Sequence, residues 1–494
     1  MEIFVSIQLH KQSSIPLYQQ LAQQIKALIL DGLLKDEEKL PPIRQLALRL
    51  GVNNVTVVNA YHRLEQEGLL YSKVGSGTFV KLDPHTRGPY SSTTTKTISG
   101  LEYNIPGLNI MDQGRLQIPS GAYNFASAIP TPELFPVADF KNILNEVLDR
   151  DGGSAFAYQE GQGYFPLRES LYRYLKNSGI SADEGSIQVI SGAQQGIDII
   201  AKSLLKPGDF VITENPTYTG AIAAFRSRGA RIIPAILKED GISIEELQDA
   251  IEKYRPRLMY IIPNFQTPTG ICYSDEKKKA LLKLCQTYNI VIIEDDSFTD
   301  LSYHSQRQPI KIMDGDGQVI YIKSFSKILM PGLRLAFLLA PKNIIPGLLR
   351  AKHSSDISTP GLIQRAFDLY LRKGLWEKHL EYMKEIYQQR YHIMLEAMET
   401  YLSPEITYCK PGGGLSFWLK LPPGSSANHF YTRCLANRVI ISPGSLFSAS
   451  EERDSQYFRL SFAGLYPEEI EKGIIAINEA YQQKKNDLLY SPLL

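Results

Sequence analysis

Apolar positions near the start of the chain follow a helical period. Their spacing of three and four residues predicts an amphipathic helix over residues 15–34. Two shorter helical patterns follow over residues 43–50 and 54–66, and the turn between them contains Gly51. Residues 70–80 form a short β-type pattern with glycines at its middle, which predicts a hairpin. Two helices joined by a tight glycine turn, followed by a hairpin, predict a winged helix-turn-helix.

A different pattern begins near residue 121. Short, nearly continuous apolar runs alternate with helical patterns as far as residue 485. Such runs are typical of strands buried on both faces, and their alternation with helices predicts an α/β domain with a mostly parallel sheet. The clearest runs are residues 188–190, 210–212, 258–262, 290–293 and 319–322.

The segment between these two patterns follows neither period. It contains several prolines and glycines and the polar run 91–97, a composition that predicts a linker. We therefore expect three parts in a chain of 494 residues. These are a winged helix-turn-helix over residues 10–80, a linker over residues 81–120 and a large domain over residues 121–485.

Composition narrows the functional classes only a little. The chain is 43% hydrophobic and 21% charged with a net charge of +1, so the whole chain shows no preference for an acidic partner. Its four cysteines include no Cys-x-x-Cys pair, and we expect neither a metal site nor a disulfide framework. We find no apolar run of membrane-spanning length and no secretion signal, so we expect a cytoplasmic protein without membrane contact.

The third predicted helix has a polar outer face. Asn54, Thr56, Asn59 and His62 face away from the positions expected to pack inward. Side-chain amides can pair with base edges in the major groove, and Asn54 suits the N6 and N7 atoms of adenine. Basic and acidic residues nearly cancel in this segment. Periodicity and charge alone therefore leave open a plain three-helix bundle with a hairpin.

The order of residues in this segment closely resembles the winged helix-turn-helix of the GntR family. The matching positions are residues 40–47, 50–52, 56–57, 60–61, 64, 67–69 and 75–80. The resemblance implies that Arg44 and Thr56 contact DNA and that Gly75 lets the wing approach the DNA backbone. Two positions depart from the family, because Pro42 stands where serine is usual and Asn54 stands where arginine is frequent.

One lysine of the large domain follows shortly after a predicted strand. Its segment, residues 324–335, contains Ser324, Ser326, Lys327 and Arg334, and the carboxyl ends of strands are where open α/β sheets bind ligands. Pyridoxal 5′-phosphate (PLP) needs an amine for its aldehyde, a carboxylate for its pyridine nitrogen and donors for its phosphate. Lys327 can supply the amine, and Arg334 with the two serine hydroxyls can contact the phosphate.

Four further segments carry groups of the matching kind. Residues 191–196 form a glycine turn between a strand and a helix, where free backbone N–H groups bind phosphate. Tyr218 offers a ring that can stack on pyridine, residues 294–296 place carboxylates at a strand end, and Arg459 lies between apolar neighbours. Each feature alone is more often a packing or ion-pairing feature. Their combination and order indicate a PLP site.

Together these segments resemble the fold-type I aminotransferases of the aspartate aminotransferase superfamily, over about residues 121–485. The resemblance implies that Lys327 forms the Schiff base with PLP and that Asp295 holds the pyridine N1–H. Arg459 corresponds to the arginine that binds a substrate carboxylate. Tyr158 corresponds to a tyrosine that reaches the phosphate of the partner subunit, so a homodimer is implied. The remaining implied cofactor contacts are Tyr218 on the ring and Ala193, Gln194, Ser324 and Arg334 at the phosphate.

Two positions depart from the enzymes. Asparagine usually precedes Pro-Thr-Gly and bonds the ring hydroxyl, whereas this chain has Thr267. A tyrosine near the end of the Asp295 strand usually contacts the same oxygen, whereas this chain has Phe298. Both changes weaken the donors around the ring oxygen. We therefore expect cofactor capture without efficient transamination.

The fusion of a GntR-type head to an aminotransferase-like domain resembles the MocR subfamily. It implies a PLP-dependent, DNA-binding transcriptional regulator, with double-stranded operator DNA as partner and a dimer that is typically head-to-tail. The effector alternatives are PLP itself, an amine or amino acid, or a noncovalent ligand. Two other readings stay open: a catalytically active aminotransferase that carries a DNA-binding domain, and a regulator that no longer uses PLP.

Overall fold

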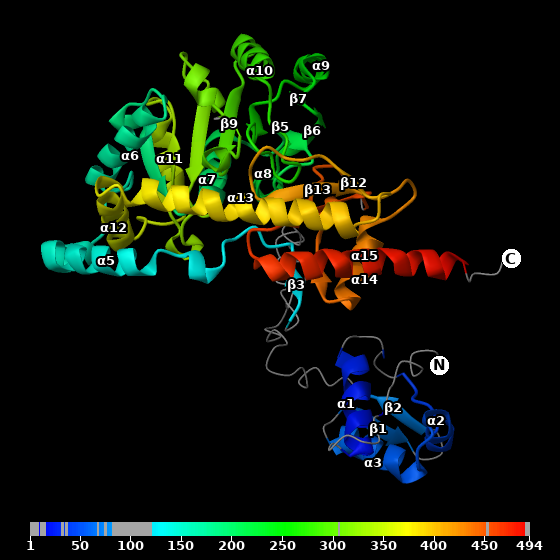
Figure 1. The fold of residues 1–494 in the computed structure, drawn as a ribbon. Coiled ribbons are helices and arrows are strands. Elements are labelled where there is room, and N and C mark those ends of the chain that lie inside the picture. Colours follow the sequence, from blue (N-terminus) through cyan, green and yellow to red (C-terminus); the bar gives the residue numbers. More distant parts are fainter. Residues whose placement is uncertain are drawn as a thin grey trace. The chain divides into compact units, whose positions relative to one another are not determined.

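A computed structural model describes residues 16–30, 38–66, 69–73, 77–81, 121–304, 307–450 and 454–489, together with Leu9 and Leu34. The chain forms two compact units, which divide between Asn104 and Ile105 (Figure 1). The linker predicted for residues 81–120 lies outside the described residues except for Lys81.

The first unit consists of three helices and a hairpin. Its elements are α1 (Leu17–Leu30), α2 (Ile43–Leu50), α3 (Asn54–Gln66), β1 (Leu70–Lys73) and β2 (Gly77–Val80). Helices α1 and α2 both pack on α3 around one apolar core. The two strands pair antiparallel with Leu70 opposite Val80, and Lys39 bridges to Phe79 beside them. The predicted winged helix-turn-helix is confirmed, with a first helix shorter than the 15–34 pattern suggested.

The turn between α2 and α3 explains why both helices have the predicted bounds. Gly51 adopts a left-handed conformation with φ 61° and ψ 37°, and its N–H donates to the carbonyls of Ala47 and Leu48. A residue with a Cβ is disfavoured in that conformation, so glycine ends α2 there. The side-chain Oδ1 of Asn53 accepts a 3.0 Å bond from the N–H of Val55, which caps the start of α3.

The second unit contains an eight-stranded sheet. In spatial order its strands are β4 (Ile187–Ile190), β11 (Ala336–Leu339), β10 (Val319–Ser324), β9 (Val291–Asp296), β8 (Leu258–Ile261), β5 (Phe210–Asn215), β6 (Arg231–Lys238) and β7 (Gly241–Ile242). The five strands from β10 to β6 run parallel to one another. Strand β11 is antiparallel to both of its neighbours, and β7 is antiparallel to β6. The expected α/β fold with a mostly parallel sheet is confirmed.

Helices cover both faces of this sheet (Figure 1). They are α6 (Phe165–Asn177), α7 (Ala193–Leu204), α8 (Thr219–Ser227), α9 (Ile244–Tyr254), α10 (Asp275–Thr287), α11 (Ile345–His353), α12 (Gly361–Arg372) and α13 (Leu375–Tyr401), and α5 (Val137–Asp151) packs on α12. Successive residues along a strand pack in different hydrophobic cores. Tyr321 packs with residues of α6, α12 and α13, while Ile320 and Ile322 pack with residues of α7, α8 and α11. Burial on both faces is the reason that β4, β8 and β11 are almost wholly apolar.

The carboxyl-terminal part adds a smaller layer. A four-stranded antiparallel sheet has the order β12 (Thr407–Tyr408), β13 (Ser416–Lys420), β16 (Tyr457–Ser461) and β15 (Ser442–Pro443). The remaining elements are β3 (Tyr123–Asn124), β14 (Val439–Ile440), α14 (Ala427–Ala436) and α15 (Pro467–Leu489). Helix α15 packs along α13, which joins this layer to the large sheet (Figure 1). Within the described parts of the chain, no helix is both long and apolar enough to cross a membrane.

Candidate functional site

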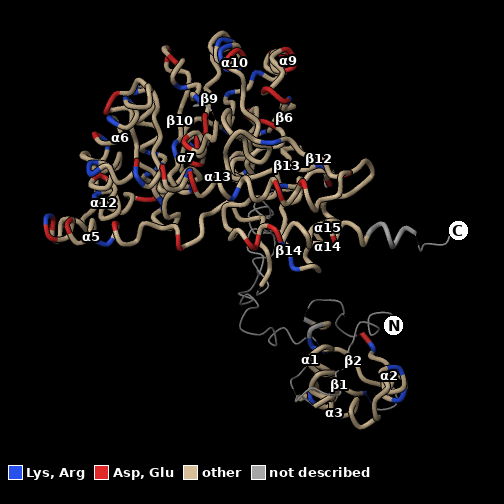
Figure 2. The backbone as a smooth tube through the Cα atoms, in the orientation of Figure 1, with Lys and Arg blue, Asp and Glu red and all other residues tan. Residues whose placement is uncertain are grey.

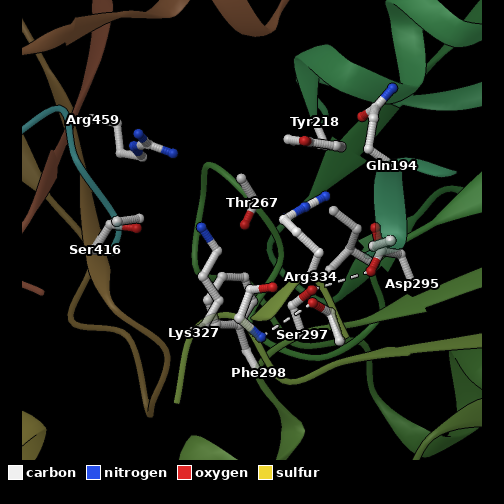
Figure 3. A pocket seen from close by; sticks show the side chains of 15 residues that line it. Gln194, Tyr218, Thr267, Asp295, Ser297, Phe298, Lys327, Arg334, Ser416 and Arg459 are labelled. Carbon is white, nitrogen blue, oxygen red and sulfur yellow. Dashed lines mark hydrogen bonds between the residues drawn. The ribbon is translucent and has the colours of Figure 1, made fainter. Parts of the chain in front are cut away.

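A pocket opens at the carboxyl ends of the parallel strands. Its walls come from segments far apart in the sequence, including the end of β9, the loop after β10, the start of α7 and strand β16 (Figure 3). The lining residues are Ala128, Ala193, Gln194, Tyr218, Ile262, Thr267, Asp295, Ser297, Phe298, Ser324, Ser326, Lys327, Arg334, Ser416 and Arg459. The structure thus brings together every pocket residue that the sequence predicted for one subunit.

Three consecutive carboxylates end β9, and they have different surroundings. Glu294 accepts bonds of 2.7 and 2.8 Å from the backbone N–H groups of residues 310–311. Asp296 pairs with Lys323 at 3.2 Å. Only Asp295 lines the pocket. The alternation of side chains along a strand separates the middle carboxylate from its neighbours and leaves it for a ligand.

Asp295 is held by two neighbours at the strand ends. The phenol of Tyr260, on β8, donates a 2.8 Å bond to Oδ2, and Ser297 donates a 3.3 Å bond to Oδ1. Burial raises the pKa of the Asp295 carboxyl to about 6, although the Tyr260 bond opposes that rise. A buried carboxyl with a raised pKa gains stability as an anion when a cationic donor reaches it. The protonated nitrogen of a pyridine ring is such a donor.

Lys327 lies three residues beyond the end of β10. Burial, together with the positive charge of Arg459, lowers the pKa of its amine to about 8, and Asp295 opposes both effects. The backbone of Lys327 is fixed because the phenol of Tyr387, on α13, donates a 2.9 Å bond to its carbonyl. A fixed lysine with a pKa near 8 has an appreciable neutral fraction at ordinary pH, which an amine needs to attack an aldehyde.

The start of α7 and Arg334 form the part of the pocket suited to an anion. The first N–H groups of a helix lack partners inside the helix and attract phosphate. Arg334 has φ 52° and donates a 2.9 Å bond from Nη2 to the carbonyl of Ser191, directly before the turn. At Gly192, which has φ 92°, an added Cβ would lie 2.4 Å from the same nitrogen. Glycine is therefore required for the guanidinium to reach this turn.

Gln194, in the first turn of α7, connects this part of the pocket to α8. Its Nε2 donates a 2.9 Å bond to the carbonyl of Gly220, and its buried Oε1 has no partner among the described residues. Tyr218 precedes α8 and places its ring on the pocket wall. Burial raises the pKa of its phenol to about 12, so the hydroxyl remains protonated.

Arg459 lies on β16, on the opposite side of the pocket from Asp295 (Figure 3). Its Nη2 donates a 2.7 Å bond to the carbonyl of Ala126, and its guanidinium lies 4.9 Å from the centre of the Phe447 ring. Burial lowers its pKa to about 10. The buried Nε has no hydrogen-bond partner among the described residues. A carboxylate would satisfy this donor, since carboxylates and guanidinium groups pair closely.

The remaining predicted residues of the large domain divide into two groups. Thr267 and Phe298 both line the pocket, as their positions in the sequence suggested. Tyr158 does not line it and is 79% exposed. Sequence reasoning missed Tyr260, Ser297 and Tyr387. A tyrosine inside the apolar run 258–262 was the available signal for Tyr260, because a buried phenol needs a hydrogen-bond partner.

The head presents most of the residues predicted to bind DNA. Asn54 and Asn59 of α3 and Arg44 of α2 are exposed, and Thr56 is half-buried. Gly75 lies outside the described residues. Figure 2 marks basic residues along the backbone of α2 in blue.

The pocket residues fit PLP as a group. Lys327 supplies an amine of lowered pKa, Asp295 supplies a buried carboxyl, and Arg334 with the start of α7 supplies donors for a phosphate. The donor of Arg459 that has no partner among the described residues lies in the same pocket and adds a place for a second anionic group.

Two families match separate parts of the chain. Residues 17–80 match the family described as bacterial regulatory proteins, gntR family, and residues 128–477 match the family described as aminotransferase class I and II. Over its aminotransferase part the chain is similar to the crystal structure of LysN, an alpha-aminoadipate aminotransferase from Thermus thermophilus complexed with N-(5′-phosphopyridoxyl)-L-leucine. That likeness has a TM-score of 0.70 and 32% identity, and it covers 76% of this chain and 97% of the other.

Two relatives that match over nearly the whole chain are named as regulators. The uncharacterized HTH-type transcriptional regulator YdfD of Bacillus subtilis is 30% identical over 94% of this chain and 96% of its own length. The probable rhizopine catabolism regulatory protein MocR of Rhizobium meliloti is 27% identical over 96% of this chain and 95% of its own. The chain belongs to the aminotransferase class I and II family. With its GntR head it is a member of the MocR subfamily of GntR-family transcriptional regulators, and its cofactor is pyridoxal 5′-phosphate.

Proposed function

We propose that a ligand bound in the PLP pocket controls how this regulator binds its operator. The observation that carries the proposal is the composition of the pocket. It retains the groups that hold a cofactor and a carboxylate, while Thr267 and Phe298 stand where aminotransferases carry asparagine and tyrosine. Such a pocket is suited to capturing a ligand reversibly without consuming it. A ligand shifts a conformational equilibrium only by its difference in affinity between the two states.

We assign the pocket residues to parts of the cofactor. Lys327 links to PLP, and Asp295 pairs with the pyridine nitrogen. Tyr218 stacks on the ring, and Thr267 lies near it. When bound, PLP supplies an aldehyde carbon that combines reversibly with amines and a ring that draws electrons from that carbon. Contacts to the phosphate are assigned to Ala193, Gln194, Ser324, Ser326 and Arg334.

The effector we propose is an amine or, better, an amino acid. Arg459 would bind its carboxylate, since the buried Nε of Arg459 has no partner among the described residues. Lys327 lies in the same pocket, so the amino group of the effector would compete with this lysine for the aldehyde carbon of PLP. An amine without a carboxylate would lack the Arg459 contact, and we expect it to bind more weakly.

A second candidate is an active aminotransferase with a DNA-binding head. It is favoured by the retained Lys327, Asp295 and Arg459 and by the likeness to enzymes such as the alpha-aminoadipate aminotransferase. Against it stand Thr267 and Phe298. Phenylalanine has no hydrogen-bond donor, and the side chain of threonine is shorter than that of asparagine. The lysine amine would therefore act beside fewer and shorter side-chain donors than those that tune proton transfer in the enzymes.

Steady-state kinetics with several amino-acid and keto-acid pairs separates the two candidates. We expect the wild-type chain to turn over well below about 1 s⁻¹, the low end of the range of turnover rates in ordinary enzymes. The double variant Thr267→Asn with Phe298→Tyr should turn over at least about tenfold faster, which corresponds to an activation barrier lower by about 1.4 kcal/mol. Lys327→Ala in that background serves as the inactive control. Wild-type turnover above about 1 s⁻¹ would favour the enzyme.

The assembly we propose is a head-to-tail homodimer in the cytoplasm, where operator DNA is accessible. Tyr158 supports a dimer, because a tyrosine of the PLP-binding domain that is 79% exposed is available to a partner chain. In this assembly the head covers residues 10–80, the linker residues 81–120 and the PLP-binding domain residues 121–485.

A further inference from the structure

Helix α3 has an outward face that is not uniformly polar. Its buried side chains are Val57, Ala60, Tyr61 and Leu64. Val55 is 59% exposed and Val58 is 44% exposed. With about 100° between successive residues, Val55 lies opposite the centre of the buried stripe. Val58 lies to one side of Val55. Two branched apolar side chains therefore project from the exposed side of the helix, and Val55 points furthest from the core.

The position of these valines in the fold indicates what they contact. Helix α3 is the second helix of the helix-turn-helix, the one that enters the major groove in proteins of this class. Base edges are contacted mainly from the first turns of that helix. Val55 is the second residue of α3 and Val58 is the fifth. Both valines thus lie in the half of the helix that reaches base edges.

Only one group in the major groove is apolar. The C5-methyl of thymine projects there, whereas the other edge groups are hydrogen-bond donors and acceptors. An exposed valine cannot satisfy a donor or an acceptor, but it buries surface against a methyl group. We propose that Val55 and Val58 read thymine methyl groups in each operator half-site. This inference rests on the DNA-binding function of the head and adds the base that its apolar positions select.

The neighbouring polar positions agree with this assignment. Asn54 and Val58 are four residues apart, as are Val55 and Asn59, so each pair lies along one row of the helix surface. Asparagine suits the N6 and N7 atoms of adenine. Each row therefore combines an amide with a methyl-binding side chain, which fits a half-site that contains both adenine and thymine.

The experiment removes single methyl groups from the DNA. An operator is first selected from random duplexes with the full-length, PLP-loaded protein. Each thymine is then replaced in turn by deoxyuridine, which lacks only the C5-methyl, and affinities are measured by fluorescence anisotropy. At one or two thymines per half-site, wild type should lose about 4-fold in affinity per methyl, the value of one buried apolar carbon. Val55→Ala should lose that sensitivity at one thymine and Val58→Ala at another.

Leu48→Ala is the matched control, because Leu48 is 86% exposed in the same head but lies on α2. This variant should keep the full wild-type response to deoxyuridine. Both valine variants should remain folded, since alanine favours helices and neither side chain is buried. If no thymine responds, or if the responses persist in both valine variants, the assignment is wrong. Failure to select any operator would instead overturn the DNA-binding function itself.

Discussion

The phenol of Tyr260 donates a 2.8 Å hydrogen bond to Oδ2 of Asp295. Both side chains are buried, and they come from the neighbouring parallel strands β8 and β9. This bond opposes the rise that burial causes in the pKa of the Asp295 carboxyl. Tyr260 does not line the pocket, so it acts on the ligand through Asp295 as a positioning residue.

Replacing Tyr260 by phenylalanine should weaken PLP binding. The ring would still fill its place, but the pKa of Asp295 would rise above about 6 and the carboxyl would be a poorer anionic partner for the pyridine nitrogen. A hydrogen bond to a charged group contributes about 1.5–3 kcal/mol. We therefore expect a loss of roughly 10–100-fold in PLP affinity, measured by spectral titration of the apoprotein.

Tyr273→Phe is the control for that variant. Tyr273 is also fully buried and donates a 2.8 Å bond to a carboxylate, that of Glu214, but neither residue lines the pocket. Its loss should leave PLP affinity unchanged. Equal PLP affinity for wild type, Tyr260→Phe and Tyr273→Phe would show that the bond to Asp295 has no part in cofactor binding.

The rate of PLP capture should depend on pH through Lys327. Only the neutral amine attacks an aldehyde, and the pKa of this amine is lowered to about 8. The capture rate should therefore rise with pH and level off above about 8. Arg459→Gln removes a positive charge that lowers this pKa, so the midpoint should move to higher pH. Stopped-flow absorbance on the apoprotein measures both profiles.

Arg228→Gln provides the charge-matched control for the pH profile. Arg228 pairs with Asp198 at 2.6 Å and does not line the pocket. Its profile should coincide with that of wild type. An unchanged midpoint in Arg459→Gln would contradict the electrostatic coupling between Arg459 and Lys327.

Two substitutions in the head should weaken DNA binding in different ways. Arg44 is exposed on α2, and we expect it to contact phosphate, so Arg44→Ala should lower affinity for every sequence and reduce the salt slope by about one unit. Asn54→Ala should relax the preference at one base position, at a cost of about 1–3 kcal/mol. Binding isotherms on the selected operator and on single-base variants distinguish the two outcomes. If both variants bind the operator as tightly as wild type, α3 is not the reading helix.

The parts of the fold that local chemistry determines could be predicted from the sequence. Helices α2 and α3 have the predicted bounds because Gly51 and Asn53 end one helix and begin the next. The pocket could be predicted because ligand groups at the ends of parallel strands meet at one edge of a sheet.

Long-range partners could not be predicted in the same way. The bond from Tyr260 to Asp295 depends on the lateral order and register of β8 and β9, which periodicity does not specify. The separate surroundings of Glu294 and Asp296 likewise depend on residues from other segments of the fold, among them Lys323. The contact proposed for Tyr158 depends on a second chain.

Whether a ligand in the PLP pocket controls DNA binding is measured as operator affinity against PLP and a panel of amines and amino acids. The same titration is run on wild type and on Lys327→Ala, with the selected operator and the full-length protein. We expect that at least one amino acid changes the operator affinity of PLP-loaded wild type, and that Lys327→Ala binds the operator but loses this response. Operator affinity that is the same with and without PLP and every ligand, or a response in Lys327→Ala equal to that of wild type, would show that ligands of the PLP pocket do not control DNA binding.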